Sequence, residues 1–178
     1  MKISRGLLQI GALFFAGRLI AQPVTNGQNA DVVLGQGNFS GGVSGTSATQ
    51  LYHPKGVAVN RATGKFFVAD YFNSRVLRWS SVNAAVNGSA AEAVFGQNAF
   101  NTSSTGQTQN TMYDPFHLVV DGNGRLWVAD FFNNRVLRFD NASSKSTGAV
   151  ADGVLGQPDF TTSSIGTTQS KKIGRAHV

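Results

Sequence analysis

Aspartate and asparagine recur at one fixed spacing in two stretches of the sequence. Asp70 and Asn73 in the first stretch occupy the places of Asp130 and Asn133 in the second. Oxygen ligands of this kind bind calcium, and paired carboxylates can serve as an acid and a base. The same residue types also close tight turns by hydrogen bonding to nearby backbone. Because a catalytic residue needs to occur only once whereas a scaffold residue recurs, we interpret all four as structural turn residues.

Arginine recurs in the same way, at positions Arg75, Arg78, Arg135 and Arg138. We expect Arg75 and Arg135 to bind the neighbouring acidic turns and therefore to be structural as well. Arg78 and Arg138 alternate with Val and Leu, which favours an ion pair or a solvated face over a partner site.

Positions that differ between the two stretches say more about function. His53 and Lys55 flank a proline at the start of one apolar run, and Phe116 and His117 follow a proline at the start of its counterpart. We interpret these four as candidate binding residues. A lone histidine is more often a scaffold residue than a ligand, and a zinc site needs three or four ligands. We therefore predict no catalytic residue, no metal ligand and no cofactor.

A repeat of about sixty residues underlies these correspondences. The sequence Leu-Gly-Gln at residues 34–36 returns as Phe-Gly-Gln at 95–97 and again as Leu-Gly-Gln at 155–157. Residues 67–79 match residues 127–139 almost completely. Turn residues divide the first unit into four short predicted strands, at residues 56–59, 65–69, 75–79 and 91–95. Such units are typical of propeller blades, so we predict an all-β fold, a β-propeller of four-stranded blades.

The repeated pattern resembles the NHL repeat, the blade unit of NHL-type propellers. The residues that carry the resemblance are Pro54-x-Gly-Val-Ala-Val59, a turn, and Val68-Ala-Asp-x-x-Asn-x-Arg-Val-Leu-Arg78. Long polar connections and the Leu-Gly-Gln-x-x-Phe start are similar to long-period NHL proteins among exported bacterial proteins. The resemblance implies a propeller of six blades, of which this chain holds about two.

The propeller fragment is expected to span residues 30–170. Its complete units are about 30–96 and 97–157, and residues 158–170 begin a third. We interpret the chain as the N-terminal part of a longer propeller, with its missing blades as natural partners.

The two ends of the chain differ from the repeats. Residues 1–21 combine a positive start with an apolar run and a small final residue, which is typical of a secretory signal peptide. Residues 22–29 are a short linker, and the repeat stops matching at residues 171–178, which we interpret as a non-native tail. The predicted location is therefore secreted, either periplasmic or extracellular.

Composition excludes several classes of function. The chain has 178 residues, a net charge of +6 and no cysteine, which excludes disulfides and cysteine zinc sites. Six of the fifteen cations lie in the two ends, so residues 22–170 are neutral and do not predict a nucleic-acid partner. The apolar run near the start is too short to span a bilayer.

Two functions remain open. The first is a secreted, non-catalytic binding or scaffold module that holds a protein, peptide or glycan through its long loops at residues 38–50 and 98–110. The alternative is a metal-dependent propeller enzyme of the peptidyl-hydroxyglycine lyase or lactonase type, with zinc or calcium in its central channel. In those lyases a Pro-His pair supplies zinc ligands. Here Pro115-Phe116-His117 is one residue out of step, so binding is the favoured interpretation.

Overall fold

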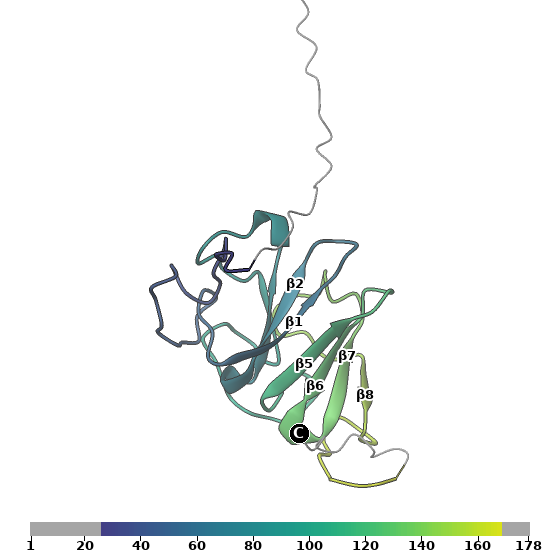
Figure 1. Ribbon diagram of the computed structural model, residues 1–178. Helices are drawn as coiled ribbons and strands as arrows, with labels where there is room; N and C mark the ends of the chain where they lie inside the picture. Colours follow the sequence, from purple (N-terminus) through teal and green to yellow (C-terminus); the bar gives the residue numbers. More distant parts are fainter. Residues whose placement is uncertain (1–25, 169–178) are drawn as a thin grey trace, which may run out of the picture. The chain divides into compact units, whose positions relative to one another are not determined.

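The computed structural model describes residues 26–168 (Figure 1). The predicted signal peptide at 1–21 and the predicted tail at 171–178 lie outside the described residues. The blades belong to one compact unit that begins at Asp31, and residues 26–30 form a turn and irregular backbone. No helix among the described residues is long and apolar enough to cross a membrane.

Eight strands form two four-stranded antiparallel sheets, in which each strand pairs with the next along the chain. The first sheet, here called the first blade, contains β1 (Pro54–Val59), β2 (Phe66–Asp70), β3 (Arg75–Trp79) and β4 (Ala93–Phe95). The second blade contains β5 (Pro115–Val120), β6 (Leu126–Asp130), β7 (Arg135–Phe139) and β8 (Gly153–Leu155). The prediction of an all-β fold built from four-stranded propeller-type blades is confirmed.

Strand boundaries differ slightly from the predicted ones. β1 begins at Pro54 rather than at residue 56, because a register shift between Pro54 and Val57 lets Pro54 pair with Asp70. The outermost strand β4 begins at Ala93 rather than at residue 91.

Tight turns join the central strands of each blade. Tyr71–Asn73 (η1) and Phe131–Asn133 (η3) are single 3₁₀ turns that link β2 to β3 and β6 to β7. Each ends at a left-handed residue, Ser74 with φ of 49° and Asn134 with φ of 50°. A third 3₁₀ turn, η2 (Val82–Ala84), follows β3.

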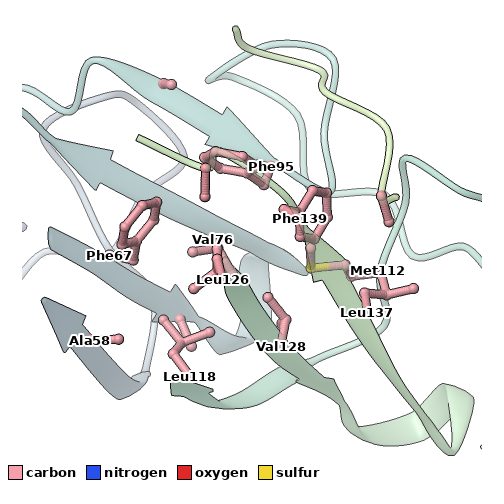
Figure 2. Packing of buried hydrophobic residues seen from close by; sticks show 14 residues of the cluster. Ala58, Phe67, Val76, Phe95, Met112, Leu118, Leu126, Val128, Leu137 and Phe139 are labelled. Atoms are coloured by element: carbon pink, nitrogen blue, oxygen red, sulfur yellow. The ribbon is translucent and has the colours of Figure 1, made fainter. Parts of the chain in front are cut away.

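Of the two buried apolar clusters among the described residues, one lies between the two blades (Figure 2). It is built from alternate residues of facing strands, as expected when one face of each sheet is buried. The rings of Phe95 and Phe139 meet edge to face with centroids 5.2 Å apart, and Phe67 packs edge-on against Phe95. Polar contacts also cross the interface, because Arg78 donates to the carbonyls of Ala142 and Lys145.

The two blades approach most closely at their innermost strands. A Cβ atom added to Gly56 would lie 2.7 Å from the carbonyl oxygen of Phe116 and 3.1 Å from the Cα of His117. Only glycine allows β1 and β5 to pack this closely, so packing determines this residue.

Phe67→Ala tests the interface between the blades. Phe67 is fully buried, so truncation should lower the free energy of unfolding by about 3–5 kcal/mol, through lost transfer energy and a cavity. Urea unfolding followed by circular dichroism measures the change. The control Val43→Ala alters a side chain that is 75% exposed and should change stability by at most about 0.5 kcal/mol. Equal effects of the two substitutions would contradict the assignment of Phe67 to the core.

Candidate binding surface

A buried carboxylate organises the turn between β2 and β3. Asp70 accepts hydrogen bonds from the backbone N–H of Tyr52 at 2.6 Å, from Asn73 Nδ2 at 2.8 Å and from Arg75 Nε at 2.7 Å. The side chains of Asp70 and Arg75 are both wholly inaccessible to solvent. These contacts fix the η1 turn and attach residue 52 to it.

The same arginine reaches from the turn into the long loop. Beyond Asp70, the guanidinium of Arg75 donates to backbone carbonyls of Thr46, Ser47, Gln50 and Phe100. Residues 38–50, predicted to be a partner-contacting loop, are therefore anchored at their end by a buried cation. Hydrogen bonds to several carbonyls offset part of the free-energy cost of burying the charged guanidinium.

The second repeat reproduces this arrangement. Asp130 accepts from the backbone N–H of Tyr113, from Asn133 Nδ2 and from Arg135 Nε, at 2.7, 2.9 and 2.7 Å. Arg135 donates further to the carbonyls of Thr108, Thr111 and Phe160. Both sets of predicted turn residues therefore lie in turns, where their side chains bond to other groups of the protein.

Burial dominates the electrostatics of these carboxyl groups. It raises the pKa of Asp70 above its ordinary value, against the opposing hydrogen bonds from Asn73, Tyr52 and Arg75. It raises the pKa of Asp130 in the same way, against the charge of Arg135. Among residues 26–168, no three His, Asp or Glu side chains are grouped so that they could hold a metal ion.

Aromatic rings gather where β1 and β5 begin and where η1 and η3 turn. We call this set the aromatic surface, and its members are Tyr52, His53, Tyr71, Phe72, Tyr113, Phe116, His117, Phe131 and Phe132. Neighbouring rings lie with centroids 4.8 to 6.4 Å apart. The series passes from the first blade to the second through Tyr71 and Phe116, whose rings meet edge-on at 5.9 Å.

Several of these rings are open to solvent. Tyr52 and Phe72 are each 45% exposed and Tyr113 is 40% exposed, while His53 and His117 are also exposed. Large half-exposed rings that pack against neighbouring rings present apolar area to solvent. Because their conformational freedom is already restricted, binding a partner costs them little further entropy.

A lysine lies within the aromatic surface. Lys55 Nζ is 5.6 Å from the ring centroid of Tyr71 and 5.5 Å from that of Phe116, which places the ammonium between two blades. Its side chain is exposed, and no ion pair within the described part of the chain includes it. The structure thus brings together the four predicted binding residues, His53, Lys55, Phe116 and His117.

The backbone is strained just before each innermost strand. His53 has φ of 61° and Asp114 has φ of 54°, a left-handed conformation that non-glycine residues rarely adopt. Asp114 is held there by Ser74 Oγ of the other blade, which donates to its carboxylate at 3.1 Å.

Burial raises the pKa of the Asp114 carboxyl group. The pKa of Tyr71 is also raised, mainly by burial and secondly by the charge of Asp114.

Sequence reasoning missed most of the rings of the aromatic surface. Tyr71 and Phe72, with Phe131 and Phe132, precede the turn asparagines in both repeats, and this recurrence was a usable signal. Gly56 occupies the position in the first repeat that His117 occupies in the second, and close packing against β5 accounts for the glycine.

Asp70→Asn tests the buried turn pair. It removes the charge beside Arg75 while keeping the shape, and leaving that buried cation unpaired should cost about 3–5 kcal/mol of unfolding free energy in urea titration. The matched control is Asp140→Asn, which breaks a pair whose side chains are 32% and 38% exposed and should cost at most about 1 kcal/mol. Equal losses would show that burial does not govern this pair.

The family model described as NHL repeat matches residues 51–79. Similar solved structures include a nidogen/laminin complex, at 17% identity over 58% of this chain and 30% of that chain, with a TM-score of 0.39. They also include a luciferin-regenerating enzyme, at 17% identity over 64% of this chain and 33% of that chain, with a TM-score of 0.42.

The chain spans about a third of the length of these two structures. No curated protein matches it. Residues 51–79 coincide with β1, β2 and β3 and the turns that join them, and the second blade repeats their pattern. The chain therefore contains an NHL repeat within a pair of propeller-type blades.

Proposed function

We propose that this chain is a non-catalytic binding module that holds a polypeptide partner on the aromatic surface. The observation that carries the proposal is the unbroken series of rings across both blades, with Tyr52, Phe72 and Tyr113 each at least 40% exposed. Aromatic side chains are enriched at the centres of protein interfaces, where a few of them supply most of the binding energy.

The repeat makes the surface suited to an extended partner. Tyr52 with Phe72 in the first blade and Tyr113 with Phe132 in the second form two equivalent ring pairs, with centroids 5.0 and 4.8 Å apart. An extended segment can place one apolar side chain on each pair. Lys55 lies between the pairs, where its ammonium can donate to a backbone carbonyl or a carboxylate of the partner.

In this proposal the long loops support the aromatic surface and do not form the binding site themselves. Residues 42–44 and His53 line one cavity of about 170 Å³, so the first loop borders the aromatic surface. Because Arg75 and Arg135 hold the loop ends, deleting a loop would leave buried donors unsatisfied. We therefore assign direct contact to the rings and a supporting role to the loops.

The enzyme alternative would use His117 together with residues of other blades. His117 is exposed and its ring neighbour is Phe116, at 4.8 Å, so the surroundings are those of an aromatic contact. Zinc or calcium is therefore proposed only under the enzyme alternative.

Export is the second part of the proposal. It is based on the sequence of residues 1–21, and it would place the binding surface in the periplasm or outside the cell. Expression with a secretion-competent host should yield a mature chain that begins at Gln22. N-terminal sequencing measures this directly, and a secreted chain that still begins at Met1, or full retention inside the cell, would contradict export.

Phe72→Ala and Tyr113→Ala test the aromatic surface. Peptides selected on the full chain from a random library should lose about tenfold or more in affinity for each variant, because each substitution removes a half-exposed anchor. Fluorescence anisotropy with the labelled peptides measures the affinity.

The matched control is Val86→Ala, which alters a 64% exposed side chain of the η2 connection. It should leave peptide affinity unchanged, and circular dichroism should show all variants folded. Unchanged affinity in Phe72→Ala and Tyr113→Ala would contradict the proposal. So would a glycan array on which the chain binds sugars through the same rings while no peptide is selected.

A further inference from the structure

A polar cleft opens between the two blades, at the end of the strands opposite the aromatic surface. Its volume is about 680 Å³, within the range of about 300–1,000 Å³ that is usual for small-molecule sites. The first blade lines it with residues 59–63, where β1 ends and turns toward β2. The second blade lines it with residues 120–124, where β5 ends, and with residues of the loop after β7. Since β1 and β5 begin at the aromatic surface and end at the cleft, the cleft is separate from that surface.

Direct hydrogen bonds join the two blades along the wall of this cleft. Asn60 is 7% exposed, and its Nδ2 donates to Ser143 Oγ at 2.9 Å. Thr63 Oγ1 lies 3.1 Å from the same oxygen. Asn60 Oδ1 accepts from the backbone N–H of Ala62 at 3.0 Å, which fixes the turn. The protein therefore forms the wall by itself, and a ligand meets a site that costs little free energy to organise.

The lining of the cleft belongs to the part of the repeat that varies. Residues 60–64 read Asn-Arg-Ala-Thr-Gly, whereas the corresponding residues 121–124 read Asp-Gly-Asn-Gly. After the third strand of each blade, residues 83–86 read Asn-Ala-Ala-Val and residues 143–146 read Ser-Ser-Lys-Ser. The second loop is therefore polar where the first is largely apolar. Because scaffold residues recur in each unit whereas a binding residue needs to occur only once, variation of this kind is expected of a binding site.

The cleft contains one cation and two amide groups that are free to bind. Arg61 is exposed, and no ion pair or hydrogen bond joins its guanidinium to another residue of the range 26–168. The side-chain amides of Asn123 and Asn141 are exposed as well, and they bond to no residue that the structure describes. All three residues line the cleft.

The carboxylate of the cleft, in contrast, already has its partners. Asp121 accepts from Arg125 Nε at 2.7 Å and from Trp127 Nε1 at 2.8 Å. It also accepts from the backbone N–H groups of Asn123 and Arg125, at 2.9 and 3.1 Å. Since Arg125 balances the charge of Asp121, Arg61 is the one unpaired charge among the described residues that line the cleft.

These groups suit a ligand that combines carboxylates with hydroxyls. A guanidinium binds a carboxylate through two parallel hydrogen bonds. Amide side chains both donate and accept, as binding a sugar hydroxyl requires. Val59 also lines the cleft and is 40% exposed, so it offers an apolar contact to the C–H face of a sugar ring. A polyphosphate or a sulfated chain carries more charge per unit, and a single cation would leave most of that charge unpaired.

We propose that this cleft binds an acidic oligosaccharide whose sugar units carry carboxylate groups. Arg61 pairs with one carboxylate, and Asn123 and Asn141 bind hydroxyls of the neighbouring rings. The site is independent of the polypeptide site on the aromatic surface, so the chain can hold both partners at opposite ends of its strands.

Isothermal titration calorimetry on the full chain tests this site, with tetrasaccharides of galacturonic, glucuronic and mannuronic acid as probes. At least one of the three should bind. Its affinity should fall about tenfold or more in Arg61→Gln, because the substitution removes charged hydrogen bonds to the carboxylate. Asn123→Ala and Asn141→Ala should each lower the affinity about threefold, since each removes neutral hydrogen bonds.

Lys65→Gln is the matched control, because it removes the same charge next to the same turn. Lys65 binds Glu92 at 2.6 Å and does not line the cleft, so the substitution should leave the affinity within about twofold. Two further probes separate the chemistry of the ligand. The methyl ester of the tetrasaccharide lacks the charges and tetraglutamate lacks the sugar hydroxyls, so each should bind about tenfold more weakly than the acidic sugar.

The inference would be overturned if none of the three tetrasaccharides binds. Equal affinity of Arg61→Gln and the unaltered chain would also overturn it, as would tetraglutamate or the methyl ester binding as tightly as the acidic sugar. Circular dichroism should show every variant folded. Peptide binding to the aromatic surface should be unchanged in Arg61→Gln, which separates a failure of this site from a failure of the other.

Discussion

The buried ion pair between Asp70 and Arg75, repeated as Asp130 and Arg135, is the contact on which each blade depends. Burying two charges is costly, and the cost is offset only when hydrogen bonds satisfy the remaining donors and acceptors. Here the carboxylate is bound by three donors and the guanidinium by several backbone carbonyls. One side chain thereby ties a β-hairpin, a 3₁₀ turn and a long polar loop together.

The same pair positions the surface proposed to bind. Tyr52 is attached to Asp70 through its backbone N–H, and Tyr71 and Phe72 lie in the turn that Asp70 and Asn73 close. Because the second repeat does the same with Tyr113, Phe131 and Phe132, two equivalent ring sets stand at the same end of neighbouring blades. Packing of Gly56 against β5 brings the sets into contact through Tyr71 and Phe116. The scaffold thus determines the spacing of the exposed rings, and these rings supply the apolar contacts proposed for the partner.

Much of the fold could be predicted from the sequence, because strand periodicity, turn residues and repetition are local signals. The acidic turn residues and the arginines that bind them could be predicted for the same reason. The aromatic surface was only partly predictable, since it depends on contacts between residues of different blades, such as Lys55 and Phe116. The difference between Gly56 and His117 illustrates the limit. Its cause is the backbone of a strand some sixty residues away, which no local pattern contains.

The central claim is that buried guanidinium groups organise both repeats, and nuclear magnetic resonance of arginine side chains tests it most directly. In the ¹⁵N-labelled chain at neutral pH, the Nε–H signals of Arg75 and Arg135 should exchange with water about a hundredfold or more slowly than that of the exposed Arg61. Both groups should be protected together, since their surroundings are equivalent. Exchange of either signal as fast as that of Arg61 would contradict the account.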